Sequence, residues 1–289
     1  MLESNLTTPQ PTDEDRVAEK SLRPDNLGEF IGQEEVVANL KVYVESAKRR
    51  KVNLDHVILF GPPGLGKTTL AYIIAKELNV NIKMSSGPVL DRPADLAGIL
   101  TNLQDRDVFF VDEIHRMNTS VEEYLYSAME DYRIDIMLDK GPNSRTIQLS
   151  LAPFTLVGAT TRMGNLTSPL RDRFGVILRL DFYSDANLKQ IIVRSAVLLD
   201  ITIDSDAADQ IACRSRGTPR IANRILRRAR DFAEVEGSGH LDLPMARQAL
   251  DRRGIDEVGL DDMDRRILTC LVKTFAGGPV GVESLAVAL

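Results

Sequence analysis

The stretch GPPGLGKT, at residues 61–68, contains the residue types that bind phosphate groups. Its glycines let backbone N–H groups turn inward around phosphate oxygens, Lys67 adds a positive charge, and the Thr68 hydroxyl is a suitable Mg²⁺ ligand. The apolar run HVILF (56–60) precedes it and a helical pattern follows, which is the context that such a loop requires. An ordinary Gly-Pro turn is the alternative. We predict that nucleotide phosphates contact Gly61, Pro63, Gly64, Leu65, Gly66, Lys67 and Thr68.

Two carboxylates follow the apolar residues of DVFFVDE (107–113), so they emerge at the end of a predicted buried strand. Ligands of open α/β sheets bind at that end of the strands. We expect Asp112 to hold Mg²⁺ in its coordination shell and Glu113 to polarise an attacking water as a general base. The alternative is a surface Asp-Glu pair that caps the next helix.

A further predicted strand, FTLVGATTR (154–162), ends in small polar residues. Either Thr160 or Thr161 is suited to orient a water against the γ-phosphate of a nucleotide. The alternative is that these β-branched residues only close the strand.

The stretch TSPLRDRFG (167–175) places Arg171 and Arg173 on what we predict to be one helical turn. Ser168 can cap that turn, and Pro169 suits its first position. Nothing inside the stretch needs two guanidinium groups so close together, so an anion elsewhere is expected. A surface cluster of ion pairs is the alternative.

Short apolar runs alternate with helical patterns through the first 184 residues, which predicts an α/β fold with a mainly parallel, wrapped sheet. The helical pattern is clear at residues 34–50, where apolar residues recur at helical spacing. The segment 133–150 differs, because two β-rich runs flank Gly-Pro-Asn and predict a hairpin. The predicted strands of the sheet are 56–60, 80–84, 107–113, 154–161 and 176–182.

After about residue 184 the strand signals stop. Residues 185–255 are expected to form a small helical bundle, and a last long helix is predicted at about 260–275, followed by GGPVG and a short apolar helix. Residues 1–20 are polar, acidic and without periodicity, which indicates a flexible arm. The breaks between the helices of the bundle are predicted at 200–204, 217–219 and 237–239.

The composition is that of a globular protein, since 43% of the 289 residues are hydrophobic and 27% are charged. A net charge of −6 excludes a protein that coats nucleic acid through bulk positive charge, so any such contact must use a local basic patch. Cys213 and Cys270 are too few for a disulfide framework or a zinc site, and we expect two small core residues in a reducing compartment. No segment resembles a signal peptide or a membrane span, which predicts a cytoplasmic protein without membrane contact.

Five motifs, GPPGLGKTT, VDEIH, GATTR, LRDRFG and GTPRIANR, together resemble those of the AAA+ ATPases, and more narrowly those of the RuvB family of Holliday-junction branch-migration motors. The resemblance extends from LRP near the N-terminus to GGPVG near the C-terminus. A DExH helicase would also carry DEIH, but the helical remainder leaves no room for its second RecA-like domain.

The resemblance implies a fold of three parts. A large AAA+ P-loop domain with a parallel sheet would span 21–184, with the hairpin 133–150 projecting from it. A small α-helical lid domain would span 185–255. Residues 256–289 would be the start of a winged-helix head domain, which binds DNA in the family.

The resemblance also implies a set of contacts to ATP or ADP. In the family the adenine lies between the N-terminal lead-in and the helical domain, and Arg220 matches an arginine that reports loss of the γ-phosphate. Gly217 would end one helix, Thr218 would cap the next and Pro219 would open it. Besides the phosphate loop and Thr160, the implied contacts are Leu22, Arg23, Ile31, Thr69, Glu130, Asp131, Tyr132, Arg173, Tyr183 and Arg220.

The chain's own phosphates would already have Lys67, Mg²⁺ and Arg220, so a further arginine is better used on a neighbouring subunit. The family motif assigns this role in trans to Arg173, which would stabilise charge at the neighbour's γ-phosphate. Arg171 would then pair with Asp172 or with an acid across the interface.

Seven arginines and no acidic residue lie between 214 and 230. Arg220, Arg224, Arg227 and Arg228 fall on one side of a helix at i, i+4, i+7 and i+8, opposite the apolar side. A subunit contact, a phosphate-tracking surface and a plain solvated face all remain open for this run.

In the family the hairpin docks the junction-binding partner RuvA, and core packing is the alternative for its apolar residues. The implied function is a homo-hexameric, ATP-hydrolysing, Mg²⁺-dependent motor that moves duplex DNA at Holliday junctions, with RuvA-type and RuvC-type partners, in recombination and repair. The rivals are another AAA+ machine, such as a clamp-loader subunit or a remodeller, and a non-hydrolysing assembly protein. The hairpin residues concerned are Ile136, Met137, Leu138, Ile147 and Leu149.

Overall fold

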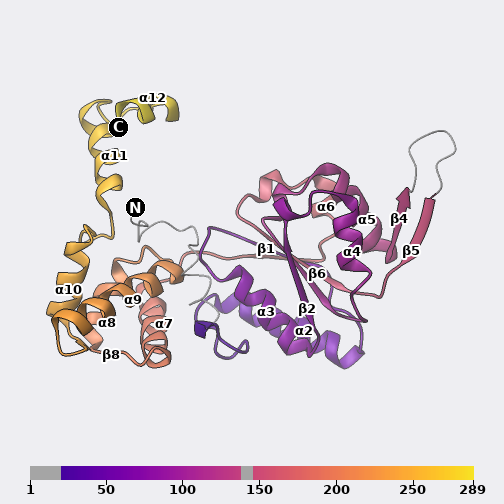
Figure 1. Cartoon of the computed structure of the whole chain (residues 1–289), viewed down its shortest axis with the longest axis horizontal. Helices are drawn as coiled ribbons and strands as arrows, with labels where there is room; N and C mark the ends of the chain where they lie inside the picture. The colour runs from indigo at the N-terminus through magenta and orange to yellow at the C-terminus, as the bar shows by residue number, and fades with distance from the viewer. Residues whose placement is uncertain (1–20, 138–145) are drawn as a thin grey trace. The chain divides into compact units, whose positions relative to one another are not determined.

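The computed structural model describes residues 21–137 and 146–289, which divide into two compact units (Figure 1). Residues 23–181 make up one of them, called here the sheet unit. Residues 182–289 belong together with Leu22 to the other, called the helical unit. The arm expected at 1–20 and the hairpin residue Leu138 lie outside the described residues.

The sheet unit is built around a five-stranded sheet with the strand order β2-β3-β6-β1-β7, in which every neighbouring pair is parallel. All five strands expected from the sequence are present, with ends that differ by up to three residues. Because the strands are parallel, their carboxyl ends meet at one edge, called here the carboxyl edge. The strands are β1 (Val57–Phe60), β2 (Ile82–Ser86), β3 (Val108–Asp112), β6 (Thr155–Thr160) and β7 (Val176–Arg179).

Helices cover both faces of this sheet, with α2 and α3 on one side and α4 and α5 on the other (Figure 1). The central strands are almost completely buried, and Phe109, Phe110 and Phe154 are the largest side chains of the core. The helices are α2 (Glu34–Arg50), α3 (Lys67–Leu78), α4 (Pro93–Leu100), α5 (Thr119–Asp131) and the single turn α6 (Ser168–Arg171). Short 3-10 turns are η1 (Gly87–Val89), η2 (Ile114–Arg116) and η3 (Met163–Asn165).

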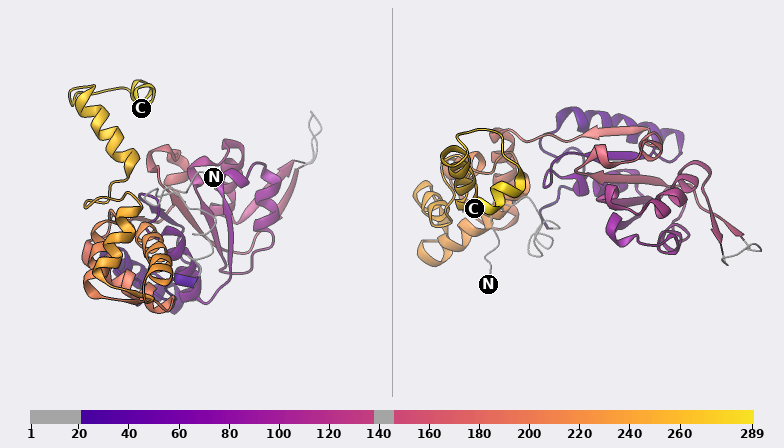
Figure 2. Two further views of the ribbon diagram at one scale, coloured as in Figure 1. Left: turned by 60° about the vertical axis from the view of Figure 1, so that its left-hand side comes forward. Right: turned by 90° about the horizontal axis from the view of Figure 1, so that it is seen from above.

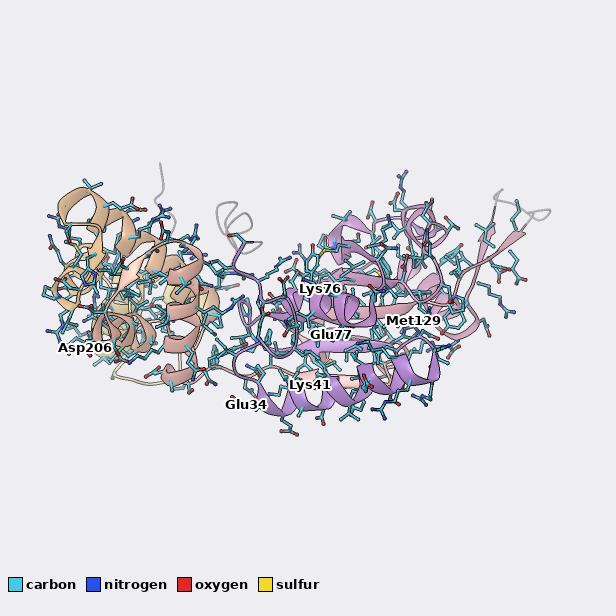
Figure 3. The ribbon with its side chains drawn as sticks, turned by 90° about the horizontal axis from the view of Figure 1, so that it is seen from below. Glu34, Lys41, Lys76, Glu77, Met129 and Asp206 are labelled. Atoms are coloured by element: carbon cyan, nitrogen blue, oxygen red, sulfur yellow. The ribbon has the colours of Figure 1, made fainter. Side chains whose placement is uncertain are left out.

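Helix α2 has the bounds that its sequence pattern predicts. The buried side chains recur at helical spacing, at Val36, Val37, Leu40, Val44 and Ala47. Acidic residues occupy the first turn and basic residues the last, which is the arrangement favoured by the helix dipole. Figure 3 shows Glu34 at the start of this helix and Lys41 on its exposed side.

The predicted hairpin is confirmed as an antiparallel pair, β4 (Arg133–Met137) and β5 (Thr146–Ser150), that projects from the sheet unit (Figures 1 and 2). Its base is part of the core, because Ile134 is fully buried and pairs with Leu149. Farther out, Ile147 is 44% exposed and lies opposite Ile136. Core packing therefore accounts for Ile134 but not for Ile147.

The helical unit contains the bundle that the sequence predicts, together with two strands that it does not. The expectation that strands end after residue 184 is wrong, because β8 (Thr202–Ile203) and β9 (His240–Leu241) form a parallel pair. Two residues per strand are too few to produce a periodic pattern. The helices are α7 (Asp185–Leu198), α8 (Ser205–Cys213), α9 (Pro219–Glu236), α10 (Leu243–Arg252), α11 (Asp262–Lys273) and α12 (Val282–Ala288).

The two cysteines differ in their surroundings. Cys270 is buried as expected, but Cys213 is exposed at the end of α8, so the prediction of a core residue is wrong there. Among the described residues, no helix combines the length and the apolar character needed to cross a membrane.

A buried histidine connects β1 with two other elements of the sheet unit. His56 precedes β1, and its Nδ1 accepts a hydrogen bond from the Leu156 N–H at 2.9 Å. Its Nε2 lies 3.2 Å from the carbonyl oxygen of Met129 and therefore carries the proton. Protonation of Nδ1 would place its N–H directly against the Leu156 N–H, so this hydrogen bond would be lost. Burial lowers the pKa of His56, although the Met129 carbonyl and Asp55 act in the opposite direction.

We predict that the sheet unit loses stability as the pH falls below about 6.5, the ordinary pKa of histidine in an unfolded chain. The folded protein binds a proton at His56 more weakly than the unfolded chain does. The contribution of His56 to the free energy of unfolding is therefore fully present above this pH and declines below it. The slope contributed by His56 would approach about 1.4 kcal/mol per pH unit.

Urea unfolding followed by circular dichroism between pH 5 and pH 8 measures this slope. His115 also has a lowered pKa, so the matched control is His56→Gln, which should be less stable at pH 8 but lose less stability on acidification. Parallel pH profiles for the two proteins would contradict the assignment to His56.

Candidate nucleotide-binding site

The loop between β1 and α3 is shaped by glycines with left-handed backbone, with φ of 145° at Gly61, 83° at Gly64 and 100° at Gly66. Gly61 also has no room for a side chain, because a Cβ there would stand 2.3 Å from the carbonyl oxygen of Leu180. The Gly61 N–H donates to the carbonyl oxygen of Thr160 at 3.2 Å. The loop therefore starts between β6 and β7, in a space that admits only glycine.

Lys67 is the first residue of α3, and its side chain turns back over the loop. The residue is buried, and its Nζ donates to the carbonyl oxygens of Gly61 at 2.8 Å and Pro62 at 2.7 Å. These two hydrogen bonds hold a positive charge at the carboxyl edge, next to the N-terminus of α3, where the helix dipole also favours an anion.

The other residues of the motif divide into anchors and exposed groups. Leu65 is fully buried and packs into the core, so only its backbone can contact a phosphate. Pro63 and the two threonines of the first turn, Thr68 and Thr69, are partly exposed. Their positions are consistent with the phosphate loop expected from the sequence.

Asp112 and Glu113 stand at the carboxyl end of β3, and both carboxylates already have partners. Asp112 Oδ1 accepts the backbone N–H of Glu113 at 2.9 Å. Glu113 has a left-handed backbone, with φ of 46°, and its carboxylate forms an ion pair with Arg116 at 2.8 Å. Gly87 packs against this turn so closely that a Cβ would lie 2.4 Å from the Glu113 carbonyl oxygen. Neither Arg116 nor Gly87 is among the residues predicted for the site, although the i,i+3 spacing in EIHR is a signal for the ion pair.

Of the two threonines at the end of β6, Thr160 is buried and its hydroxyl is already engaged. The hydroxyl lies 2.9 Å from Nδ1 of His115 and accepts the Arg162 N–H at 3.0 Å. Burial lowers the pKa of His115, so its ring is neutral at pH 7. Thr161, the next residue, is exposed. His115 was not selected from the sequence.

The arginine-rich turn is confirmed at α6, but its cap is one residue earlier than predicted. Thr167, not Ser168, is the N-cap and accepts the Leu170 N–H, because the Thr167 hydroxyl is held by the buried Glu122. Pro169 consequently occupies the second helical position. Arg171 donates to the Ser168 hydroxyl at 3.4 Å, and the expected ion pair with Asp172 is not formed among the described residues.

Arg173 lies against the end of α5 within its own protomer. Its Nη2 is 3.0 Å from Glu130, its Nη1 donates to the carbonyl oxygen of Pro169 at 2.7 Å, and its guanidinium stands 4.5 Å from the centre of the Tyr126 ring. Of the other two residues predicted here, Asp131 pairs with Arg133, and Tyr132 accepts a hydrogen bond from Asn53 through its hydroxyl. The structure thus brings Arg173 and Glu130 together, which the sequence did not indicate.

The lead-in to α2 is fastened to α3 by side-chain contacts. Arg23 stands 4.3 Å above the ring of Tyr72, Lys76 pairs with Asp25 at 2.6 Å, and Glu77 accepts the Leu27 N–H. Lys76 and Glu77 lie at the end of α3 (Figure 3). Ile31, in the same lead-in, is partly exposed. Leu22 belongs to the helical unit, where it is buried and accepts a hydrogen bond from Arg194.

In the helical unit, Tyr183 is buried and its N–H donates to the carbonyl oxygen of Gly217 at 2.9 Å. Pro219 opens α9 as predicted, and Arg220 follows it with partial exposure. Thr218 occupies the N-cap position but does not cap the helix, because its hydroxyl donates to the Arg216 carbonyl instead.

The basic run of 214–230 is not a uniform solvated face. Arg224 is only 3% exposed and Arg214 only 5%, so of the three alternatives left open, a plain solvated face does not fit Arg224. Farther along α9, Asp231 lies 3.1 Å from Arg228 and 3.0 Å from Arg230. Acidic residues beyond the run thus compensate part of its charge, which the spacing of the arginines alone does not reveal.

The parallel sheet, the glycine loop with its lysine, and the carboxylates and threonines at the same edge define a P-loop protein of the AAA+ class. Three family models match consecutive parts of the chain. They are described as the Holliday junction DNA helicase RuvB P-loop domain (residues 22–180), the RuvB AAA lid domain (183–256) and the RuvB C-terminal winged helix domain (257–289). The chain belongs to the RuvB family.

Known proteins agree with this assignment. The Holliday junction branch migration complex subunit RuvB of Salinibacter ruber is 58% identical over 275 residues, which cover 95% of this chain and 80% of that protein. The same subunit of Chlorobaculum tepidum is 59% identical, with 94% and 79% covered. A structure of the Thermotoga maritima RuvB Holliday junction branch migration motor is similar with a TM-score of 0.83 and 51% identity, covering 93% of this chain and 85% of that one.

We predict that Gly61→Ala lowers the affinity for ATP by at least about tenfold, because the added methyl group must displace the Leu180 carbonyl or the loop itself. Titration with a fluorescent ATP analogue measures the effect. The matched control is Gly164→Ala in η3, where a Cβ would meet no atom within 4 Å. If Gly61→Ala binds the analogue as tightly as Gly164→Ala does, the proposed constraint on the loop is wrong.

Proposed function

We propose that this chain is the ATP-hydrolysing motor subunit of a Holliday-junction branch-migration complex. The observation that carries the proposal is the carboxyl edge itself, where Lys67, Asp112, Glu113 and Thr161 follow three neighbouring strands. Membership of the RuvB family supports the same function, because the relatives are named as branch migration complex subunits. Cytoplasmic location is part of the proposal.

The residues of the carboxyl edge suit ATP with Mg²⁺. The described residues contain no group of three or more His, Cys, Asp or Glu side chains that could hold a metal ion by themselves. Thr68 and Asp112 would instead hold Mg²⁺ jointly with phosphate oxygens, and both offer the oxygen ligands that Mg²⁺ prefers. When bound, the ion neutralises phosphate charge. Lys67 would bind the β- and γ-phosphates, which requires its ammonium group to leave the loop carbonyls.

Glu113 would act as the general base that takes a proton from the attacking water. Its carboxylate is about half exposed and is paired with Arg116, so hydrolysis requires that this carboxylate turn toward the water. Thr161 would orient the water or the γ-phosphate, since the Thr160 hydroxyl is engaged with His115. Thr160 would then hold the end of β6 in place next to Thr161 and would not contact the nucleotide through its side chain.

Arg173 would act in trans, on the γ-phosphate held by the next subunit of a homo-hexameric ring. Glu130, at the end of α5, forms an ion pair with this arginine, and Asp131 and Tyr132 follow Glu130 in the chain. All three would reach the same neighbouring nucleotide. An arginine supplied across an interface contributes about 10³–10⁵ in rate in comparable systems.

Nucleotide state would be transmitted by the helical unit. We assign the large ATPase domain to 21–184, the small helical domain to 185–255 and the start of the winged-helix head to 256–289. Arg220, from the small domain, and Tyr183, at the end of the large domain, would contact the nucleotide, and Leu22, Arg23 and Ile31 would surround the adenine. Loss of the γ-phosphate would then release Arg220 and change the angle between the domains.

The hairpin would dock a RuvA-type protein, which brings the motor to the junction, while a RuvC-type resolvase would join the assembly there. An exposed isoleucine at the outer part of a projecting hairpin is the kind of apolar contact that partner proteins bury. Leu149 and the residues around Ile136 would complete this surface. Duplex DNA would pass through the ring.

We predict that Glu113→Gln binds ATP as tightly as the wild type but lowers kcat by about a hundredfold or more, because the amide cannot accept the proton. Phosphate release and binding of a fluorescent ATP analogue provide the two measurements. Glu123→Gln, an exposed carboxylate of α5, is the matched control and should keep the wild-type rate. Absence of turnover by the wild type at any protein concentration would favour a non-hydrolysing assembly protein instead.

We predict that Ile147→Asp abolishes the stimulation of ATP turnover and branch migration by a RuvA-type protein while leaving the basal ATPase unchanged. A charge at this position opposes burial of the hairpin in an apolar groove. Val42→Asp, at an exposed apolar position of α2, controls for surface charge. Undiminished stimulation of the Ile147→Asp protein in a titration with the partner would refute the docking assignment.

A further inference from the structure

One face of α5 is directed at the segment that carries Arg173. Glu122, Tyr126 and Glu130 follow one another at intervals of four residues, so they share a face of the helix. Each of the three contacts a residue of the segment 167–173. The face therefore meets this segment at three successive turns of the helix.

The ring of Tyr126 is held at its hydroxyl end. The hydroxyl donates to Glu122 at 2.5 Å and lies 3.0 Å from the Thr167 hydroxyl, which itself donates to Glu122. Burial raises the pKa of Tyr126, and the hydrogen bond to Glu122 acts in the same direction, so the hydroxyl remains a donor at neutral pH. Partners from two elements thus fix the orientation of the ring.

The backbone around Arg173 is also fixed. Leu170 is fully buried, and Phe174 is 4% exposed, with its ring 3.2 Å from the position of a Cβ on Gly158. Core packing on both sides of Arg173 leaves the side chain as the part that can move. The side chain itself is 23% exposed, and its Nε lies buried without a hydrogen bond among the described residues.

The two side-chain contacts of the Arg173 guanidinium, with Glu130 and with the Tyr126 ring, differ in how firmly they hold it. The Glu130 side chain is 56% exposed, so water and other anions compete for its ion pair. The Tyr126 ring is half-buried, and attraction to its face depends on distance from the ring and not on one hydrogen-bond direction. The guanidinium can therefore exchange its anion without leaving the ring.

We propose that Tyr126 is a positioning residue for Arg173, whose ring retains the guanidinium while its anion changes from Glu130 in the free protomer to the γ-phosphate of a neighbouring subunit. The inference rests on the proposed role of Arg173 in trans. A phosphate offers more charge and more acceptor oxygens than a carboxylate, so it displaces Glu130 when the neighbour is loaded. Tyr126 limits the rotamers of Arg173 beforehand, which lowers the entropy lost when the arginine engages.

The test compares Tyr126→Leu, which removes the ring, with Tyr126→Phe, which keeps the ring and loses the hydroxyl. Steady-state ATP turnover of the full chain is measured with duplex DNA at a protein concentration at which wild-type turnover no longer rises. We expect Tyr126→Leu to lower kcat by about tenfold with a KM for ATP within about twofold of wild type. Tyr126→Phe should retain kcat within about twofold.

A double-mutant cycle with Arg173→Ala identifies the residue through which Tyr126 acts. Tyr126→Leu should have no further effect on kcat in the Arg173→Ala background, because the arginine that it positions is gone. A general structural role would lower kcat in both backgrounds and would not be rescued by phenylalanine. Circular dichroism melts check folding, and Tyr126→Met, with a flexible side chain of similar bulk to leucine, replaces Tyr126→Leu if the latter does not fold.

The outcomes separate this inference from the function on which it rests. Wild-type kcat for Arg173→Ala would overturn the role of Arg173 in trans. A large loss for Arg173→Ala with wild-type kcat for Tyr126→Leu would overturn the positioning role alone. Equal losses for Tyr126→Leu and Tyr126→Phe, or additive losses in the cycle, would also overturn it.

Discussion

The close approach of three backbone segments at Gly61 is the constraint on which the rest of the site depends. The strand β1 is hydrogen-bonded to β6 on one side and to β7 on the other. Where the chain leaves the sheet, at Gly61, it passes in direct contact with the Leu180 carbonyl. Only a residue without a Cβ can pass. Once the loop takes this path, Lys67 and the N-terminus of α3 lie at the same edge as the residues that end β3 and β6.

Three of the charged groups proposed for the chemistry already have polar partners inside their own protomer. Lys67 is bonded to loop carbonyls, Glu113 to Arg116, and Arg173 to Glu130. The two ion pairs are partly or largely exposed, and such pairs stabilise a fold by only about 0–1 kcal/mol. These ion pairs hold the side chains in defined positions. They are weak enough for a phosphate group or a residue of a neighbouring subunit to replace one of the partners.

Local sequence signals were sufficient for the sheet, α2, the hairpin and the phosphate loop, because periodicity and glycine spacing specify those features within a few residues of the chain. Features set by distant contacts were missed or misplaced. The N-cap at Thr167 depends on Glu122, and the engagement of Thr160 depends on His115, each pair separated by 45 residues. The burial of Arg224 likewise depends on the packing of α9, which helical spacing alone does not reveal.

The strand order has a consequence for synthesis on the ribosome. Val57 of β1 pairs with Val157 and with Val176, so the strand that carries the phosphate loop has no partner in the sheet until about a hundred further residues have been made. At about 5–20 residues per second, this interval lasts roughly 5–20 s. The edge pair β2–β3 needs far less chain and can form first. A nascent chain would therefore hold the apolar strand β1 without its partner strands for seconds.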